Sequence, residues 1–171
     1  SQRSLEQLVE LTKRYYVTEK AGQLAKDLEK LAKEQDDLAE DKINSDTTNK
    51  EQEKLNQQFE ELAKELDELQ KDNKDLKKPI DLNVSEDTKQ GVKDNQEQAL
   101  EEIKKHQGNE QASDMEKMKQ NASSAKKNQK SAAQKMKEMS EALGESSSGG
   151  GGGSSVAEDA EMLRQILDNL V

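Results

Sequence analysis

The amino-acid sequence predicts an all-α protein, an extended antiparallel helical bundle with coiled-coil-like packing and a tethered C-terminal helix. The 171 residues are 37% charged, 29% hydrophobic and only 2% aromatic, which is too little apolar material for an α/β core or a β-sandwich. The apolar residues that are present recur at alternating steps of four and three, as in the heptads of coiled coils. A tract of glycine and serine then separates one last amphipathic segment from the rest.

We predict a first helix over about residues 4–42. Ser4 and Gln7 have the spacing of a capping box at its start, and the turn-forming residues 43–49 end it. Its main apolar stripe follows the heptad rule and consists of Val17, Ala21, Leu24, Leu28, Leu31, Gln35 and Leu38. Similar spacing in a shifted phase is kept upstream by Leu5, Leu8, Thr12 and Tyr15.

The second predicted helix, about residues 49–78, carries the most regular pattern in the chain. Thr48 and Glu51 form another capping box, and Pro79 ends the helix because it disfavours helical angles at the residue before it. The stripe runs without a miss through Leu55, Phe59, Leu62, Leu66, Leu69, Asn73 and Leu76. A chain with few apolar residues can therefore still bury most of them along one helix face.

Two further helices are predicted over about residues 86–106 and 114–143, although one kinked helix over 86–143 is also compatible with the sequence. Ser85 can cap the first, and Gly108–Asn109 is expected to break or kink it. Ser113 and Glu116 form a third capping box, and Gly144 is expected at the C-terminal end. The stripe of the third helix comprises Val92, Gln96, Ala99 and Ile103. The stripe of the fourth comprises Met115, Met118, Ala122, Ala125, Gln129, Ala132, Met136, Met139 and Leu143.

Residues 144–155 read as a flexible Gly/Ser linker that spans roughly 20 Å on average, and we interpret it as native low-complexity sequence. Residues 156–171 then form a short amphipathic helix. A helix of this length is marginal on its own in water, so we expect it to dock on a protein surface. The residues that we expect to anchor it are Leu163, Ile166, Leu167 and Leu170.

Charge and connection length predict how the helices pair. The short connections at 43–49 and 79–85 favour antiparallel neighbours. Residues 115–137 hold seven lysines and one glutamate, a net charge of +6, whereas the whole chain has a net charge of −10. The basic helix therefore has acidic neighbours to select. We interpret the polar stripe residues Asn73 and Gln129 as register-setting positions, with a buried polar site as the alternative.

The residues of most catalytic and metal sites are scarce. There is no cysteine and one histidine, His106, which excludes thiol chemistry and paired-histidine metal sites. Four of the five methionines fall on the fourth stripe, which favours packing over metal ligation. The lysine-rich run lacks the aromatics that stack nucleic-acid bases, and no apolar run reaches the length of a membrane span. We predict no catalytic, cofactor or metal residue, no nucleic-acid partner and no membrane span.

The C-terminal segment resembles one known family. Residues 158–171 (EDAEMLRQILDNLV) and 134–139 (QKMKEM) are similar to the long helical region, rich in Gln, Glu and Lys, of an uncharacterised Bacteroidota-type family of large membrane-anchored envelope proteins. The resemblance covers about 40 residues. It implies a place in the cell envelope, on the periplasmic side of a membrane-anchored protein, and it implies no catalytic residue. Because the chain begins at Ser1 rather than Met, we expect it to be a piece of a longer protein.

Two functions are compatible with these patterns. The first is a non-catalytic structural, scaffold or assembly segment that packs helix faces against another protein, either a second copy of itself or another envelope component. The second is a regulated binding module, in which the C-terminal helix occupies a groove of the bundle until a partner helix displaces it. An enzyme is not expected, because the chain offers neither a pocket-forming core nor a convergent set of polar residues.

Overall fold

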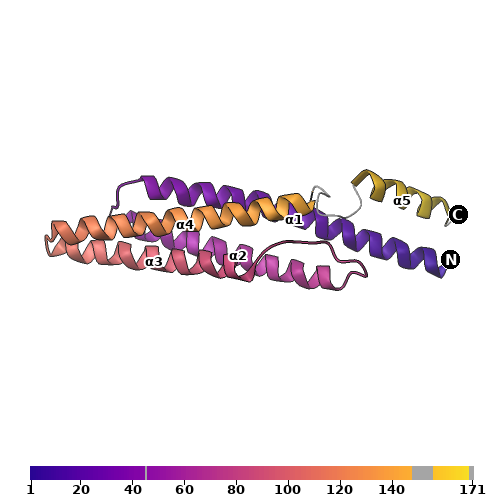
Figure 1. The fold of residues 1–171 in the computed structure, drawn as a ribbon, viewed down its shortest axis with the longest axis horizontal. Coiled ribbons are helices and arrows are strands. Elements are labelled where there is room, and N and C mark those ends of the chain that lie inside the picture. The colour runs from indigo at the N-terminus through magenta and orange to yellow at the C-terminus, as the bar shows by residue number, and fades with distance from the viewer. Residues whose placement is uncertain (45, 148–155, 170–171) are drawn as a thin grey trace.

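The computed structural model describes residues 1–44, 46–147 and 156–169 and is all-helical within them. Five helices follow one another: α1 (Gln2–Glu40), α2 (Thr47–Lys74), α3 (Glu86–Gln111), α4 (Met115–Ser147) and α5 (Val156–Asn169). The first four lie side by side along one long axis, and α5 lies beside the N-terminal end of α1 (Figure 1). This confirms the predicted all-α bundle with a separate C-terminal helix.

The four long helices pack in a ring. Among the described helices, α1 contacts α2, α2 contacts α3, α3 contacts α4 and α4 returns to α1, while the diagonal pairs make no backbone contact. Consecutive helices run in opposite directions (Figure 1), as expected for an up-and-down bundle with short connections. The core lies between all four helices and includes Val17, Leu24, Leu28, Leu31, Phe59, Leu66, Leu69, Val92, Ala132, Met136, Met139 and Leu143.

Helix α4 lies especially close to α1 because small residues face one another there. The Ser140 hydroxyl donates to the backbone carbonyl of Ala25 at 2.6 Å. A Cβ placed on Gly22 would lie 3.2 Å from the Cβ of Ser147, and one placed on Gly144 would lie 4.0 Å from the Cβ of Ala25. Interaxial distance is set by the side chains at the contact, so these residues let the two backbones approach.

The stripe predicted for the first helix is confirmed from Val17 to Leu38, since every residue of it is buried. In α2 the buried face differs slightly from the predicted stripe. Ala63 is buried, whereas Leu62 is only partly buried. The prediction for the start of α4 is wrong. Met115 is 64% exposed, because residues 115–122 lie beyond the end of α1, whose Glu40 pairs with Lys126 and Lys130 further along α4.

The second helix ends at Lys74, earlier than the predicted residue 78. The cause is the side-chain amide of Asn73, which donates to the carbonyl of Ile80 at 2.6 Å and accepts from the Ile80 N–H at 2.8 Å. These bonds hold the extended connection 75–85 against α2. Asn73 therefore anchors a connection and does not set the register between helices.

Two glycines were expected to interrupt helices and do not. Helix α3 continues through Gly108 and Asn109 to Gln111, and the chain reverses at Ser113, whose φ is 56°. Residues 86–143 thus form two helices joined by a tight turn. Helix α4 continues through Gly144 to Ser147, where the Ser147 hydroxyl bonds to the Gly144 carbonyl at 2.9 Å. The predicted linker therefore loses residues 144–147 to α4, and its remainder, 148–155, lies outside the described residues.

The helix N-termini follow the predicted chemistry at some positions and use a neighbouring residue at others. Ser85 caps α3 as predicted, with its hydroxyl accepting from a first-turn N–H. Ser1 caps α1 by accepting from the N–H of Ser4. Ser4, which was predicted to cap the helix, therefore lies within it. Asp114 in place of Ser113 caps α4.

Glycine substitutions test the close packing of α1 and α4. Gly144→Ala and Gly108→Ala should each stabilise the protein by about 0.5–1 kcal/mol, since alanine favours the helix and neither new Cβ meets a close atom. Gly22→Leu should destabilise it, since the added atoms run into Ser147. Urea unfolding followed by circular dichroism measures all three. A stabilising Gly22→Leu would contradict the described packing.

Candidate functional site

The distinctive region is the end of the molecule where α1 extends beyond the other long helices (Figure 1). The connection after α2 marks the edge of the bundle there. The Glu10 carboxylate accepts from the N–H of Lys77 at 3.0 Å through both oxygens, and Arg14 donates to the carbonyl of Lys78 at 3.1 Å. Past this point α5 packs on α1, and its backbone comes close to no other described helix. We call α1 residues 2–16 together with α5 the open end.

The structure divides the predicted docking residues of α5 into two groups. Ile166 is buried and Leu163 is half-buried, so these two side chains pack within the chain. Leu167 is 48% exposed and stays accessible. Leu170 lies outside the described residues. The described centre of the apolar face of α5 thus packs on α1 of the same chain.

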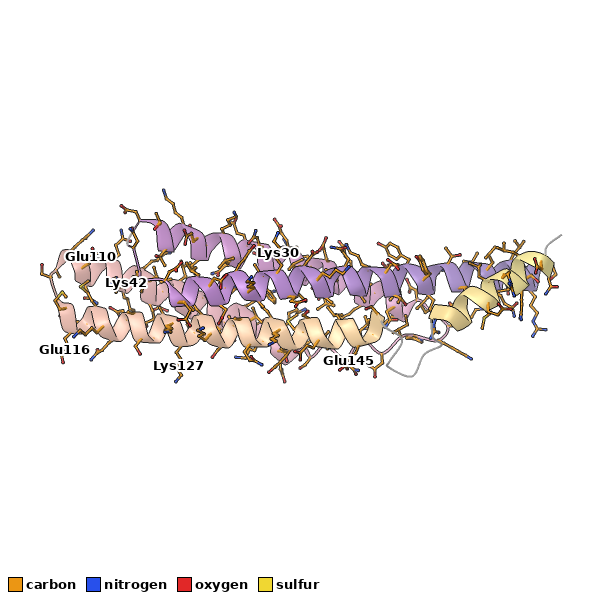
Figure 2. All side chains as sticks on the ribbon, turned by 90° about the horizontal axis from the view of Figure 1, so that it is seen from above. Lys30, Lys42, Glu110, Glu116, Lys127 and Glu145 are labelled. Atoms are coloured by element: carbon orange, nitrogen blue, oxygen red, sulfur yellow. The ribbon has the colours of Figure 1, made fainter. Side chains whose placement is uncertain are left out.

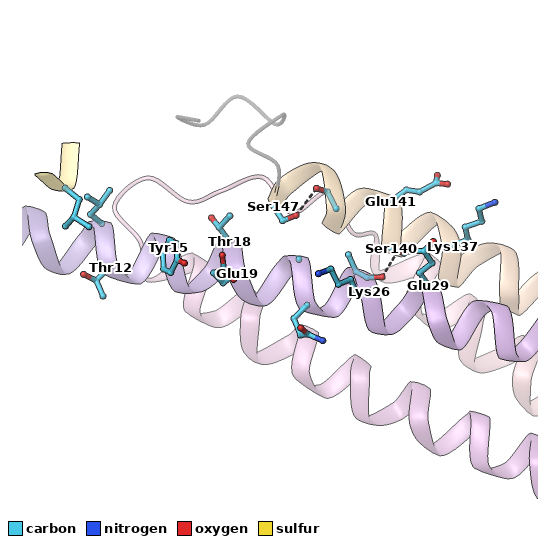
Figure 3. A pocket seen from close by; sticks show the side chains of 16 residues that line it. Thr12, Tyr15, Thr18, Glu19, Lys26, Glu29, Lys137, Ser140, Glu141 and Ser147 are labelled. Atoms are coloured by element: carbon cyan, nitrogen blue, oxygen red, sulfur yellow. Dashed lines mark hydrogen bonds between the residues drawn. The ribbon is translucent and has the colours of Figure 1, made fainter. Parts of the chain in front are cut away.

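A groove of about 790 Å³ runs between α1 and α4 next to α5 (Figure 3). Its small residues are buried or half-buried, and its charged residues are exposed. Leu163 of α5 closes one end together with α1 residues. The small lining residues are Gly22, Ala25, Ser140, Gly144 and Ser147, and the charged ones are Glu19, Lys26, Glu29, Lys137 and Glu141.

The serine hydroxyls of the groove are bonded within the chain. The hydroxyl of Ser140 is already bonded to a carbonyl of α1, and that of Ser147 is bonded to the carbonyl of Gly144 at 2.9 Å. The surrounding charges are of both signs, which is typical of the borders of a helix-packing surface. A narrow apolar floor between charged borders fits an amphipathic helix.

Exposed hydrophobic side chains concentrate at the open end. The described residues include seven large exposed hydrophobics, and six of them belong to α1 residues 2–16 or to α5. A scattered exposed leucine is normal on a protein surface, but a group of them marks an interaction site. The six are Leu5, Val9, Tyr15, Tyr16, Met162 and Leu167.

In the middle of the bundle, four buried glutamines form one polar layer, one from each long helix. Their exposed fractions are 3% or less. The amides of Gln35 and Gln52 bond to each other in both directions, at 2.9 and 2.8 Å. Gln129 donates to Gln52 at 3.0 Å and Gln96 donates to Gln35 at 3.2 Å. The layer therefore joins α1, α2, α3 and α4 through neutral amides.

The bonds of this layer support the register-setting interpretation of Gln129. Each amide needs a partner in one particular register, because an unpaired buried amide costs free energy. Sequence reasoning identified Gln35, Gln96 and Gln129 on stripes but missed Gln52. The signal was present, since Gln52 precedes Leu55 by three and so continues the heptad upstream.

Ion pairs join the basic helix to acidic α1, as the charge pattern predicts. Lys130 contacts Asp36 at 2.7 Å and also pairs with Glu40, and Lys126 lies 3.5 Å from Glu40. The hydrogen bond from Lys130 lowers the pKa of the Glu40 carboxyl, and the charge of Lys126 adds to this effect. Such exposed pairs contribute little energy, and charged side chains cover the outside of the bundle generally (Figure 2).

Lys89 is the one lysine buried among the described residues. Burial lowers its pKa, but hydrogen bonds to Asp67 at 2.6 Å and to Glu86 at 3.0 Å outweigh burial and raise the pKa overall. The lysine is thereby held charged, so it serves to pair α3 with α2 and is not poised as a base.

His106 is buried in α3, and its Nδ1 has no hydrogen-bond partner in the described structure. It lines a cavity at the opposite end of the molecule with Met115 and Met118. No group of three or more His, Cys, Asp or Glu residues in the described ranges could hold a metal ion. Within those ranges there is also no helix of the length and apolarity needed to cross a bilayer.

Comparison of the chain with models of protein families, with curated proteins and with solved structures finds no match.

The glutamine layer yields a prediction in two parts. Gln52→Ala should lower the free energy of unfolding by about 1–3 kcal/mol, because it leaves buried amides of Gln35 and Gln129 short of a partner. Replacing all four glutamines with leucine should instead raise the melting temperature while reducing the dispersion of the NMR spectrum, since the register is no longer specified. A quadruple variant that is less stable than Gln52→Ala would contradict this account.

Proposed function

We propose that this chain is a non-catalytic structural segment, a helical scaffold that assembles with another protein by packing helix faces at its open end. The observation that carries the proposal is the location of the exposed hydrophobic residues. Along the bundle, the apolar stripes of the four long helices pack against one another in the core. At the open end, Leu5, Val9 and Tyr16 of α1 and Leu167 of α5 remain exposed, and burial of such side chains is what drives association.

The proposed place of this scaffold is the cell envelope. Its support is the likeness of residues 134–139 and 158–171 to the helical region of membrane-anchored envelope proteins. The partner class that follows is another protein with an amphipathic helix, either a second copy or another envelope component. The acidic net charge of −10 supports a protein partner over nucleic acid.

Photocrosslinking in the cells that produce the protein tests the proposed function. A photoreactive benzoylphenylalanine in place of Tyr16 should give discrete crosslinked products, because Tyr16 lies in the open end and is 56% exposed. The same group in place of Lys127, an exposed residue on the outer surface of α4 (Figure 2), is the matched control and should give none. Equal yields at the two positions would contradict the proposal.

The position of α5 favours a second function, the regulated binding module. Helix α5 already covers part of α1 through Ile166, and its Leu163 closes one end of the groove. A partner helix with a better apolar face could take this place, since a tethered helix docked through few buried residues is held weakly. The groove beside α4 would then receive the partner.

Ile166→Asp separates the two functions. The substitution should release α5, seen as lower heteronuclear NOE values for residues 161–169, without changing the melting temperature, because Ile166 is not part of the main core cluster. Gln165→Asp, on the exposed face, is the control. In a scaffold, released α5 no longer contributes Leu167, so crosslinking from position 16 should fall. In a regulated module, it should rise. Unchanged NOE values would refute docking through Ile166.

A further inference from the structure

One face of α1 changes character where the bundle begins. Over the open end it carries Leu5, Val9, Thr12 and Tyr16, spaced by four, three and four and all exposed; we call these four residues the outer stripe. The same alternation continued into the bundle reaches Glu19, Gln23, Lys26 and Lys30, which are all polar and exposed. The face therefore carries large apolar side chains up to Tyr16 and polar side chains from Glu19 onward.

Helix α5 does not cover the outer stripe. Its Leu163 lines the groove together with Leu11, which is buried. Thr12 lines the same groove and lies at the border between the outer stripe and α5. At the open end the cross-section of the molecule thus falls from four helices to the pair α1 and α5 (Figures 1 and 2). A pair of amphipathic helices cannot enclose its apolar residues as a bundle of four does.

We propose that a second copy of this chain occupies the outer stripe, in an antiparallel arrangement that joins two open ends. The pair α1 and α5 of each copy then completes a four-helix cross-section that continues the bundles on either side. This inference rests on the proposed function and names its partner. The partially exposed Met162 and Leu167 of α5 lie on either side of its contact with α1 and gain cover in this arrangement.

Charge complementarity supports a second copy and sets its direction. Glu6 and Lys13 flank the outer stripe on the same side, both are exposed, and neither forms an ion pair within the described part of the chain. The midpoint of the stripe falls between Val9 and Thr12. Antiparallel two-fold pairing therefore brings Glu6 of each copy nearest Lys13 of the other, which gives two equivalent ion pairs across the interface.

A parallel arrangement lacks these features. It would place Lys13 opposite Leu8 of the second copy, and it would lay the two bundles against each other along the polar continuation of the stripe through Gln23 and Lys30. The antiparallel arrangement sends the two bundles in opposite directions, so only the apolar ends meet.

Sedimentation of the purified whole chain over a range of concentrations tests the inference. The wild type should form a dimer that dissociates on dilution. Glu6→Lys and Lys13→Glu should each weaken the dimer about tenfold, because each turns both interface ion pairs into like-charge pairs. Mixing the two variants should restore wild-type affinity, as should the double swap in one chain. Both residues are exposed, so circular dichroism should show each variant folded like the wild type.

A wild-type chain that stays monomeric at every concentration overturns the inference. A dimer whose affinity is unchanged by both Glu6→Lys and Lys13→Glu also overturns it. The proposed function fails separately, through the photocrosslinking experiment. If the probe at position 16 captures a different protein while the purified chain remains monomeric, the scaffold proposal stands and the second copy is wrong.

Discussion

The scarcity of apolar side chains is the constraint on which the structure depends. With 29% hydrophobic residues, each helix offers only a narrow apolar stripe, and such a stripe is hidden only when several helices meet around one axis. The ring of α1 to α4 satisfies this condition over most of its length. This condition is not met at the open end, where α1 extends beyond the other long helices and only α5 packs along it. The assembly function that we propose rests on this difference in length.

A core with few apolar residues also needs specific contacts that select one arrangement of the helices. Apolar stripes of similar spacing can slide by a heptad at little cost, whereas the layer of Gln35, Gln52, Gln96 and Gln129 has partners in one register. Small residues add a second restriction, because Ser147 of α4 fits closely against Gly22 of α1 and the Ser140 hydroxyl donates to the carbonyl of Ala25. The ion pairs of Lys130 with Asp36 and Glu40 then favour α4 as the neighbour of acidic α1. The glutamine layer, the small residues and the ion pairs all serve precise helix packing.

Much of this fold follows from spacing alone, since periodicity reports which face of a helix is buried. The stripe of α1 from Val17 to Leu38 was predictable for that reason. Residues whose role depends on a neighbour were not. Gly144 has the sequence context of a helix end, but α4 continues past it to Ser147, which lies against Gly22 of α1. Met115 fits the stripe of α4 and is exposed, because the sequence does not show that α1 stops short of it. At the site, amphipathicity identified the apolar face of α5, whereas the burial of Ile166 and the exposure of Leu167 depend on where α5 lies.

The central claim is that α1 is a single helix in two environments, enclosed over residues 17–40 and open over residues 2–16. Amide hydrogen exchange of the whole chain, compared at low and high protein concentration, tests it most directly. In dilute solution the account predicts much faster exchange for the amides of residues 5–16 than for those of residues 21–38, because local opening is easy where few buried contacts hold the helix. At high concentration the protection of residues 5–16 should rise while that of residues 21–38 stays constant. Equal protection along all of α1 in dilute solution would contradict the account.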